Sequence, residues 1–199
     1  MNFLAHIHLS RNNSDEMIGN FLGDFVKAGQ ENNYPPEIKR GIFIHRKIDS
    51  FTDSNPIFKK SCYRFPEGLR RYSRIAVDIF YDHFLAINFH FYSNLTLEEF
   101  IDYFYFHFFN GNFEKPKKLE KIIPYLSDKN YFLSYRDKRY IKNVLFRMSK
   151  RLKRKNFLAE CYLVLDEEYE KLEKDFMEFY PELENFVFSL RNGNLDNYR

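Results

Sequence analysis

The segment 41–53 carries three side chains that could share one metal ion. His45, Asp49 and Asp53 are spaced by four residues, and on an α-helix this spacing places side chains along one face. Isoleucine and phenylalanine neighbours indicate that the face looks inward, where an imidazole and two carboxylates are costly unless a partner satisfies them. A divalent metal would do so, and so would a salt bridge with Arg46 or with a neighbouring helix. This segment alone leaves both alternatives open.

Histidine and aspartate also occur in apolar surroundings nearer the start of the sequence. His6 and His8 are one residue apart, so both could contribute to a site from an extended segment but not from one helix face. Asp24 follows Gly23 and lies among apolar residues, so it needs a cation or several hydrogen-bond donors. The alternatives are structural or exposed histidines and an aspartate that caps a helix locally.

A further group lies in a strongly apolar part of the sequence. Asp78 and Asp82 are spaced by four in a segment with apolar residues almost all round, which predicts a buried helix. Their carboxylates repel each other there unless a cation lies between them. His83 lies about 100° around the helix from Asp82. The first 83 residues therefore hold all the candidate ligands.

The combination of imidazole and carboxylate suits a transition metal. Mn²⁺, Fe²⁺ and Zn²⁺ accept this donor set, and a bound metal could hold phosphate oxygens and lower the pKa of a water molecule. Arg46, directly after His45, is the nearest candidate for a phosphate clamp. These residues favour a metal-dependent hydrolase, and a buried polar network without metal is the alternative.

A basic segment lies in the second half of the sequence. Six of its nine residues are Arg147, Lys150, Arg151, Lys153, Arg154 and Lys155. The segment could be the solvated end of a helix, where positive charge is favourable, or a nucleic-acid patch. The net charge of the chain is only +3, unlike that of a dedicated nucleic-acid binder, so nucleic acid is not the expected partner.

The spacing of apolar residues predicts helices. They recur mostly at intervals of three and four, and seven Gly and seven Pro are few for a β-rich protein. We expect an all-α protein with about seven to nine helices, a single compact helical domain over residues 1–190 and a frayed tail at 191–199. The longer expected helices cover 14–27, 38–51, 69–89, 97–109, 136–151 and 157–179, with Pro181 ending the last one.

The sequence also gives expectations about the compartment. Cys62 and Cys161 are far apart and form no CxxC motif, which favours a reducing environment. The first eight residues lack the positive region of a signal peptide, and no apolar stretch reaches the length of a membrane span. We therefore expect a cytoplasmic protein that does not act on a membrane.

Five short motifs, taken in order, resemble bacterial acyl carrier protein phosphodiesterases. They are the segments 1–9 with its two histidines, 19–26, 41–53, 78–85 and 135–137. The resemblance implies an HD-domain-like helical fold in a divergent branch of the HD-domain phosphohydrolases. It also implies a Mn²⁺-dependent enzyme, with Fe²⁺, Mg²⁺ or Zn²⁺ as alternatives. One departure is that the sequence has no His-Asp dipeptide, only the reversed pair Asp82–His83.

The same resemblance implies a substrate and a set of roles. The substrate would be the phosphodiester that joins 4′-phosphopantetheine to a serine of the carrier protein, and the products would be apo carrier protein and 4′-phosphopantetheine. Asp49 would act as a catalytic residue as well as a ligand, Arg46 would neutralise charge on phosphate oxygens, and His83 would protonate the departing serine oxygen. The implied candidate ligands are His6, His8, Asp24, His45, Asp49, Asp78 and Asp82.

Carrier proteins are acidic, so the resemblance makes the basic segment the expected docking surface. Arg70, Arg71 and Arg74 could extend this surface, which would mainly set the rate of association and its sensitivity to salt. The oligomeric state does not follow from these residues.

Two other functions fit the same sequence. A related hydrolase could use the metal pocket on a nucleotide or another small phosphodiester, and it would need no basic docking surface. Alternatively, a non-enzymatic helical binding protein could use the basic segment, with the polar pocket only structural. That protein would bind no metal and would keep its function after Asp24→Ala or Asp49→Ala.

Overall fold

The all-α class is confirmed by a computed structural model that describes residues 1–11, 13–128 and 130–192. These residues form twelve α-helices, five short 3-10 helices and no β-strand. The α-helices are α1 (Phe3–Leu9), α2 (Ser14–Leu22), α3 (Pro36–Ser54), α4 (Pro56–Tyr63), α5 (Glu67–Arg70), α6 (Ser73–Ile87), α7 (Leu97–Asn110), α8 (Ile123–Leu126), α9 (Asn130–Leu133), α10 (Lys138–Arg151), α11 (Tyr162–Glu167) and α12 (Tyr169–Asn192). This exceeds the expected seven to nine because several helices of only four to six residues lie between the long ones.

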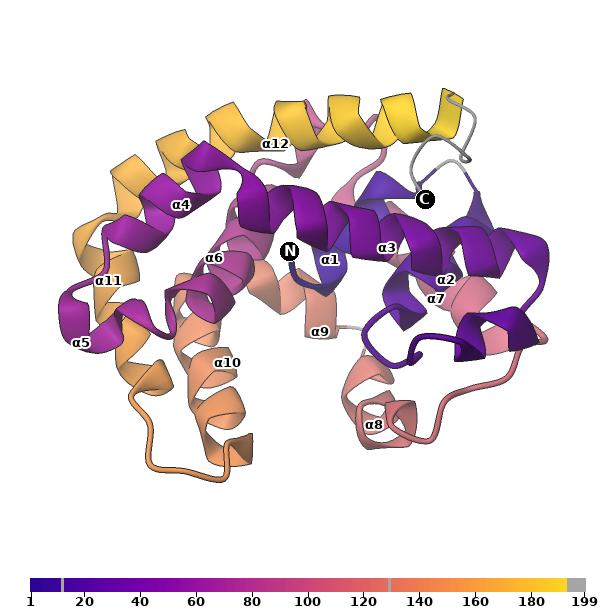
Figure 1. The fold of residues 1–199 in the computed structure, drawn as a ribbon, viewed down its shortest axis with the longest axis horizontal. Helices are drawn as coiled ribbons and strands as arrows, with labels where there is room; N and C mark the ends of the chain where they lie inside the picture. Colours follow the sequence, from indigo (N-terminus) through magenta and orange to yellow (C-terminus); the bar gives the residue numbers. More distant parts are fainter. Residues whose placement is uncertain (12, 129, 193–199) are drawn as a thin grey trace.

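The helices form one compact domain around a continuous apolar core. In Figure 1, α12 runs along the upper edge of the molecule, α3 runs beneath it and α1 lies behind α3. The long helix α12 packs against α3, α4 and α6, while α1 packs against α2 and α6. This arrangement places α1 inside the domain, so the histidines of a seven-residue helix are fully buried.

The backbones of α2 and α3 almost touch. A Cβ atom on Gly19 would lie 2.0 Å from the carbonyl oxygen of Ile38, and one on Gly41 would lie 2.1 Å from the carbonyl oxygen of Glu16. Only glycine allows two helices to approach this closely. One turn further along, the close approach brings Asn20 on α2 against His45 on α3.

Two expected helices differ from the sequence prediction. The single helix expected over 69–89 is divided into α5 and α6, and the helix expected over 157–179 is divided into a 3-10 turn, α11 and α12. Pro181 does not end the last helix but lies within it. Although proline removes one backbone hydrogen bond, the helix continues because Leu183, Val187 and Leu190 still bury their side chains in the core.

The prediction of a frayed tail over 191–199 is wrong for its first residue, Arg191. Arg191 belongs to α12, and its Nε donates a 2.8 Å hydrogen bond to Glu16 at the start of α2. Residues 193–199 lie outside the described part of the chain. Within the described residues, no helix combines the length and the apolar character needed to cross a membrane.

Candidate metal and phosphodiester site

Three of the expected ligands converge at the edge of the interior, where the two histidines are buried and Asp49 is about half exposed. His6 comes from α1, and His45 and Asp49 lie one turn apart on α3. The Nε2 atom of His6 is 3.3 Å from one carboxylate oxygen of Asp49, and the Nε2 atom of His45 is 3.2 Å from the other. The possible ligand atoms of the three residues lie within 4.8 Å of one another. Among the described residues, these three make the group that could enclose a metal ion most tightly.

Asn20 fixes the orientation of both imidazole rings. Its side-chain oxygen is 2.8 Å from Nδ1 of His6, and its backbone oxygen is 2.8 Å from Nδ1 of His45. The side-chain amide nitrogen of Asn20 donates to the hydroxyl of Ser10 at 2.9 Å, which leaves the amide oxygen facing His6. Both oxygens can only accept, so each Nδ1 must carry the proton. In the neutral rings the lone pair therefore lies on Nε2, which faces Asp49 in both residues.

This arrangement is electrostatically incomplete by itself. Burial is the main cause that lowers the pKa of His6 to about 4, so its ring is neutral at pH 7. Burial opposes ionisation of Asp49, but the contacts with His45 and His6 and the nearby Met1 ammonium outweigh it and hold the pKa of Asp49 well below its usual range. Among the described residues, Nε2 of His6 has no hydrogen-bond partner. A buried nitrogen lone pair next to a carboxylate is unfavourable, and a bound cation between the two would stabilise both groups.

Two further aspartates lie at the edge of this cluster. An oxygen of Asp24 is 3.7 Å from Nε2 of His45, and the side chain is about half exposed. An oxygen of Asp78 is 3.0 Å from the amino nitrogen of Met1, which is 3.7 Å from Asp49. Burial raises the pKa of Asp78. The Met1 ammonium lies between the carboxylates of Asp49 and Asp78.

His8 and Asp82 do not join the cluster. The two ring nitrogens of His8 contact the hydroxyl of Tyr180 at 2.7 Å and the backbone oxygen of Tyr92 at 3.2 Å. Both histidines lie on one helix instead of the extended segment that the sequence allowed, so they face different directions. Asp82 accepts hydrogen bonds from the first backbone N–H groups of α1, at 2.8 and 3.1 Å. It holds the start of the helix that carries His6, and burial raises its pKa to about 7.

Arg46, the expected phosphate clamp, and His83, the expected proton donor, both form hydrogen bonds with other residues of the protein. Arg46 forms a two-point contact with Glu31 at 3.1 and 3.2 Å, which lowers the pKa of Glu31 to about 2. The ring nitrogens of His83 contact the backbone oxygen of Tyr135 at 2.6 Å and the hydroxyl of Tyr169 at 2.8 Å. Neither nitrogen is left for a substrate oxygen, and burial lowers the pKa of His83. We therefore leave Arg46 and His83 out of the reaction proposed below.

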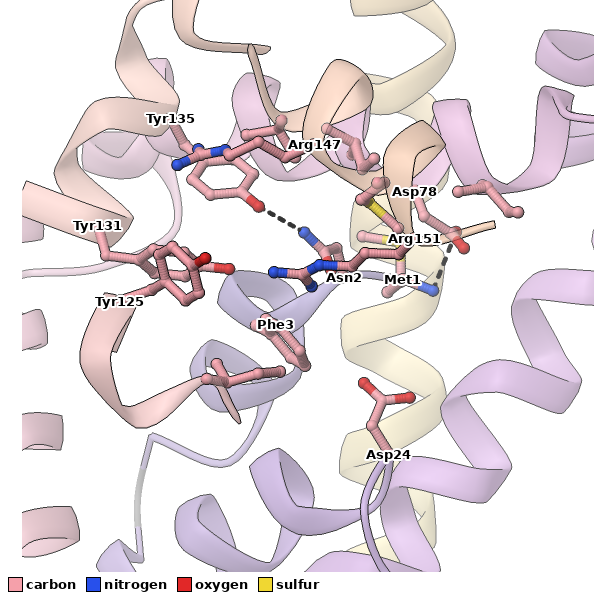
Figure 2. A pocket seen from close by; sticks show the side chains of 15 residues that line it. Met1, Asn2, Phe3, Asp24, Asp78, Tyr125, Tyr131, Tyr135, Arg147 and Arg151 are labelled. Carbon is pink, nitrogen blue, oxygen red and sulfur yellow. Dashed lines mark hydrogen bonds and ion pairs between the residues drawn. The ribbon is translucent and has the colours of Figure 1, made fainter. Parts of the chain in front are cut away.

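Beside the cluster lies a cavity of about 290 Å³. Asp24, Asp78 and Met1 line one side of it, and tyrosines of the segment 125–135 line the opposite side (Figure 2). Two members of the basic segment, Arg147 and Arg151, also line the cavity. The other four, Lys150, Lys153, Arg154 and Lys155, are exposed on the surface.

The sequence did not indicate the role of Asn20 or of the tyrosines. A buried asparagine between two glycines that are four residues apart was the available signal for Asn20. For Tyr125, Tyr131 and Tyr135 no signal was available, because 15 tyrosines occur in the chain.

Comparison with known proteins agrees with the motifs. The family model described as acyl carrier protein phosphodiesterase matches residues 1–183. Proteins named acyl carrier protein phosphodiesterase from Escherichia coli (strain K12 / DH10B) and Salmonella agona (strain SL483) are each 34% identical over 184 residues, which is 92% of this chain and 95% of the relative. No solved structure matches. The chain belongs to the acyl carrier protein phosphodiesterase family.

Proposed function

We propose that this phosphodiesterase acts on holo acyl carrier protein. It cleaves the phosphodiester between 4′-phosphopantetheine and the carrier serine, in a reaction that needs a divalent metal, with Mn²⁺ as the first choice. The observation that supports the metal requirement is the meeting of two buried Nε2 atoms and one half-exposed carboxylate. The family supports the carrier protein as the substrate.

The residues present fit such an ion. His6, His45 and Asp49 would hold it, and imidazole with carboxylate is a donor set that Mn²⁺, Fe²⁺ and Zn²⁺ accept. When bound, the ion would act as a Lewis acid toward a phosphate oxygen and lower the pKa of a water molecule. The two oxygens of Asn20 hold the Nδ1 protons, so in the neutral rings both Nε2 lone pairs are left for the ion.

The other groups of the site would act on substrate and water. Asp24 is half exposed beside His45 and faces the cavity, so it can accept a hydrogen bond from the attacking water. Arg147 and Arg151 supply positive charge along the cavity from which the diester must enter. The relationship to HD-domain phosphohydrolases is also part of this proposal.

The first test follows the mass of holo acyl carrier protein during incubation with the enzyme and Mn²⁺. We expect loss of the phosphopantetheine mass, appearance of free 4′-phosphopantetheine and a block of both by a chelator. Unchanged holo protein in the presence of enzyme with bound metal would favour a small phosphodiester as the substrate. If the enzyme binds no metal at all, the cluster is only a buried polar network.

A second prediction concerns the exposed part of the basic segment. Lys150→Glu combined with Arg154→Glu should reduce kcat/KM for holo carrier protein by about 10- to 100-fold at low salt, because charge complementarity accelerates association with an acidic partner. The difference should shrink at high salt. The matched control is Lys171→Glu with Lys174→Glu on α12, which changes the net charge equally. Equal losses in both double variants would refute a docking role for this segment.

A further inference from the structure

We propose that the cavity beside the cluster binds the pantetheine arm of the carrier protein, and this rests on the function proposed above. The phosphate end of the arm faces Asp24 and Asp78, and the chain of amides ending in the thiol extends toward the tyrosines. The cavity adjoins the cluster, since Asp24 and Asp78 line the cavity and lie at the edge of the cluster. A substrate phosphate at the cluster therefore has its attached arm directly at the cavity entrance.

Much of the cavity wall suits an uncharged chain, while Arg147 and Arg151 supply positive charge along it. Apolar side chains from α6 and α10 line much of it, namely Ile75, Ile79, Val144 and Met148. These are suitable neighbours for the methyl and methylene groups of pantetheine. The volume of about 290 Å³ is near the lower end of the range for ligand pockets.

Neutral hydroxyl groups at the far end match the amides of the arm. Asn2 donates a 2.8 Å hydrogen bond to the hydroxyl of Tyr135, which fixes that side chain in the cavity (Figure 2). Burial raises the pKa of Tyr131 to about 12, so its hydroxyl stays neutral. Neutral hydroxyls can donate to amide carbonyls and accept from amide N–H groups.

At the rim of the cavity, a side-chain contact connects α8 with α10. The guanidinium of Arg151 lies over the ring of Tyr125, 5.7 Å from its centroid. This cation–π contact joins α8 and α10, which both contribute residues to the cavity wall. The bridge places a positive charge at the rim, between the exposed basic residues and the cluster. An arm that leaves an acidic carrier protein docked on the basic segment would therefore enter past Arg151.

The test uses pantetheine, which lacks the phosphate, as the probe. Titration calorimetry with wild-type enzyme should show saturable binding, and pantetheine should inhibit cleavage of holo carrier protein competitively. Ile75→Trp, at a partly exposed position of the cavity wall, should abolish this binding. The ratio of kcat/KM for holo carrier protein to that for bis(p-nitrophenyl) phosphate should fall about tenfold or more, because the diester is then misplaced. A second variant, Tyr131→Phe, should weaken pantetheine binding without filling the cavity.

The experiment has a control, and it distinguishes failure of arm binding from failure of the proposed function. Leu163→Trp, at an exposed position on α11 away from the cavity lining, should behave like the wild type. If wild type cleaves holo carrier protein but does not bind pantetheine, or if Ile75→Trp changes neither measurement, the arm does not occupy the cavity. If wild type cleaves no holo carrier protein, the proposed function fails. Calorimetry with Ile75→Trp then still decides whether the cavity binds the arm.

Discussion

Asp49→Asn should lose its bound metal and more than about 100-fold of its kcat/KM for holo carrier protein, a larger effect than that of changing an outer-shell residue. Within the described residues, Asp49 is the carboxylate that contacts both inward-facing imidazoles, at 3.3 and 3.2 Å. An asparagine has nearly the same volume but no negative charge, so the site would attract a cation much less. The measurements are metal content by mass spectrometry and the rate of 4′-phosphopantetheine release.

The same variant should still fold without metal. The folded protein holds the pKa of Asp49 low, so the Asp49 charge stabilises the metal-free fold at neutral pH and its removal should lower the midpoint of thermal unfolding. The amide nitrogen of asparagine can donate a hydrogen bond to an Nε2 lone pair and offset part of this loss. Thermal unfolding of the metal-free variant should therefore remain a single cooperative transition, which separates loss of function from loss of folding. Asp53→Asn is the matched control, because Asp53 is exposed and pairs with Arg74. Asp49→Asn with full metal content and activity would refute the proposed ligand set.

Gly41→Ala should destabilise the protein by about 3 kcal/mol or more, which is the upper range for overpacking of an interior contact. The added Cβ would lie 2.1 Å from the carbonyl oxygen of Glu16 and 2.7 Å from the backbone nitrogen of Asn20. Both neighbours are backbone atoms of α2, so the two helices must separate. The gain of about 1 kcal/mol in helix propensity offsets only part of this cost.

The measurement is urea unfolding, in which the midpoint should fall while the slope stays constant. Because α2 and α3 also set the contact between Asn20 and His45, metal affinity should fall as well. Gly68→Ala is the control, since the described structure has no atom within 4 Å of a Cβ added there. That change should be neutral or slightly stabilising. A Gly41→Ala protein as stable as the wild type would mean that the helices are less tightly packed than described.

The four-residue spacing on α3 correctly predicted that His45 and Asp49 lie together, but it wrongly placed Asp53 beside them. A step of four residues turns a helix by about 400°, so Asp49 lies about 40° around α3 from His45, and Asp53 lies about 80° around. The first pair still converges on one point, whereas Asp53 has turned away to the surface and pairs with Arg74. A spacing of four residues therefore predicts a shared site for residues one turn apart but not for residues two turns apart.

The remaining differences depend on contacts between distant segments. Whether His6 or His8 faces the cluster depends on how α1 lies against α2 and on the position of Tyr180, 172 residues away from His8 in the sequence. The role of Asn20 requires both of its oxygens to meet rings from two other helices. Likewise, the basic segment is one run in the sequence, but only Arg147 and Arg151, one turn apart on α10, line the cavity. The other four basic residues lie elsewhere on the surface.

The position of α12 has a consequence for the order of events during synthesis. Its Tyr180 contacts His8, and its Arg191 contacts Glu16, so the last described helix closes over the first two. During translation, residues 1–83 leave the ribosome long before these partners exist. The buried imidazoles and carboxylates of the site must therefore stay hydrated in the nascent chain, and α1 can take its final place only after Arg191 has emerged. For this reason, a nascent chain that ends before α12 should show no high-affinity metal binding.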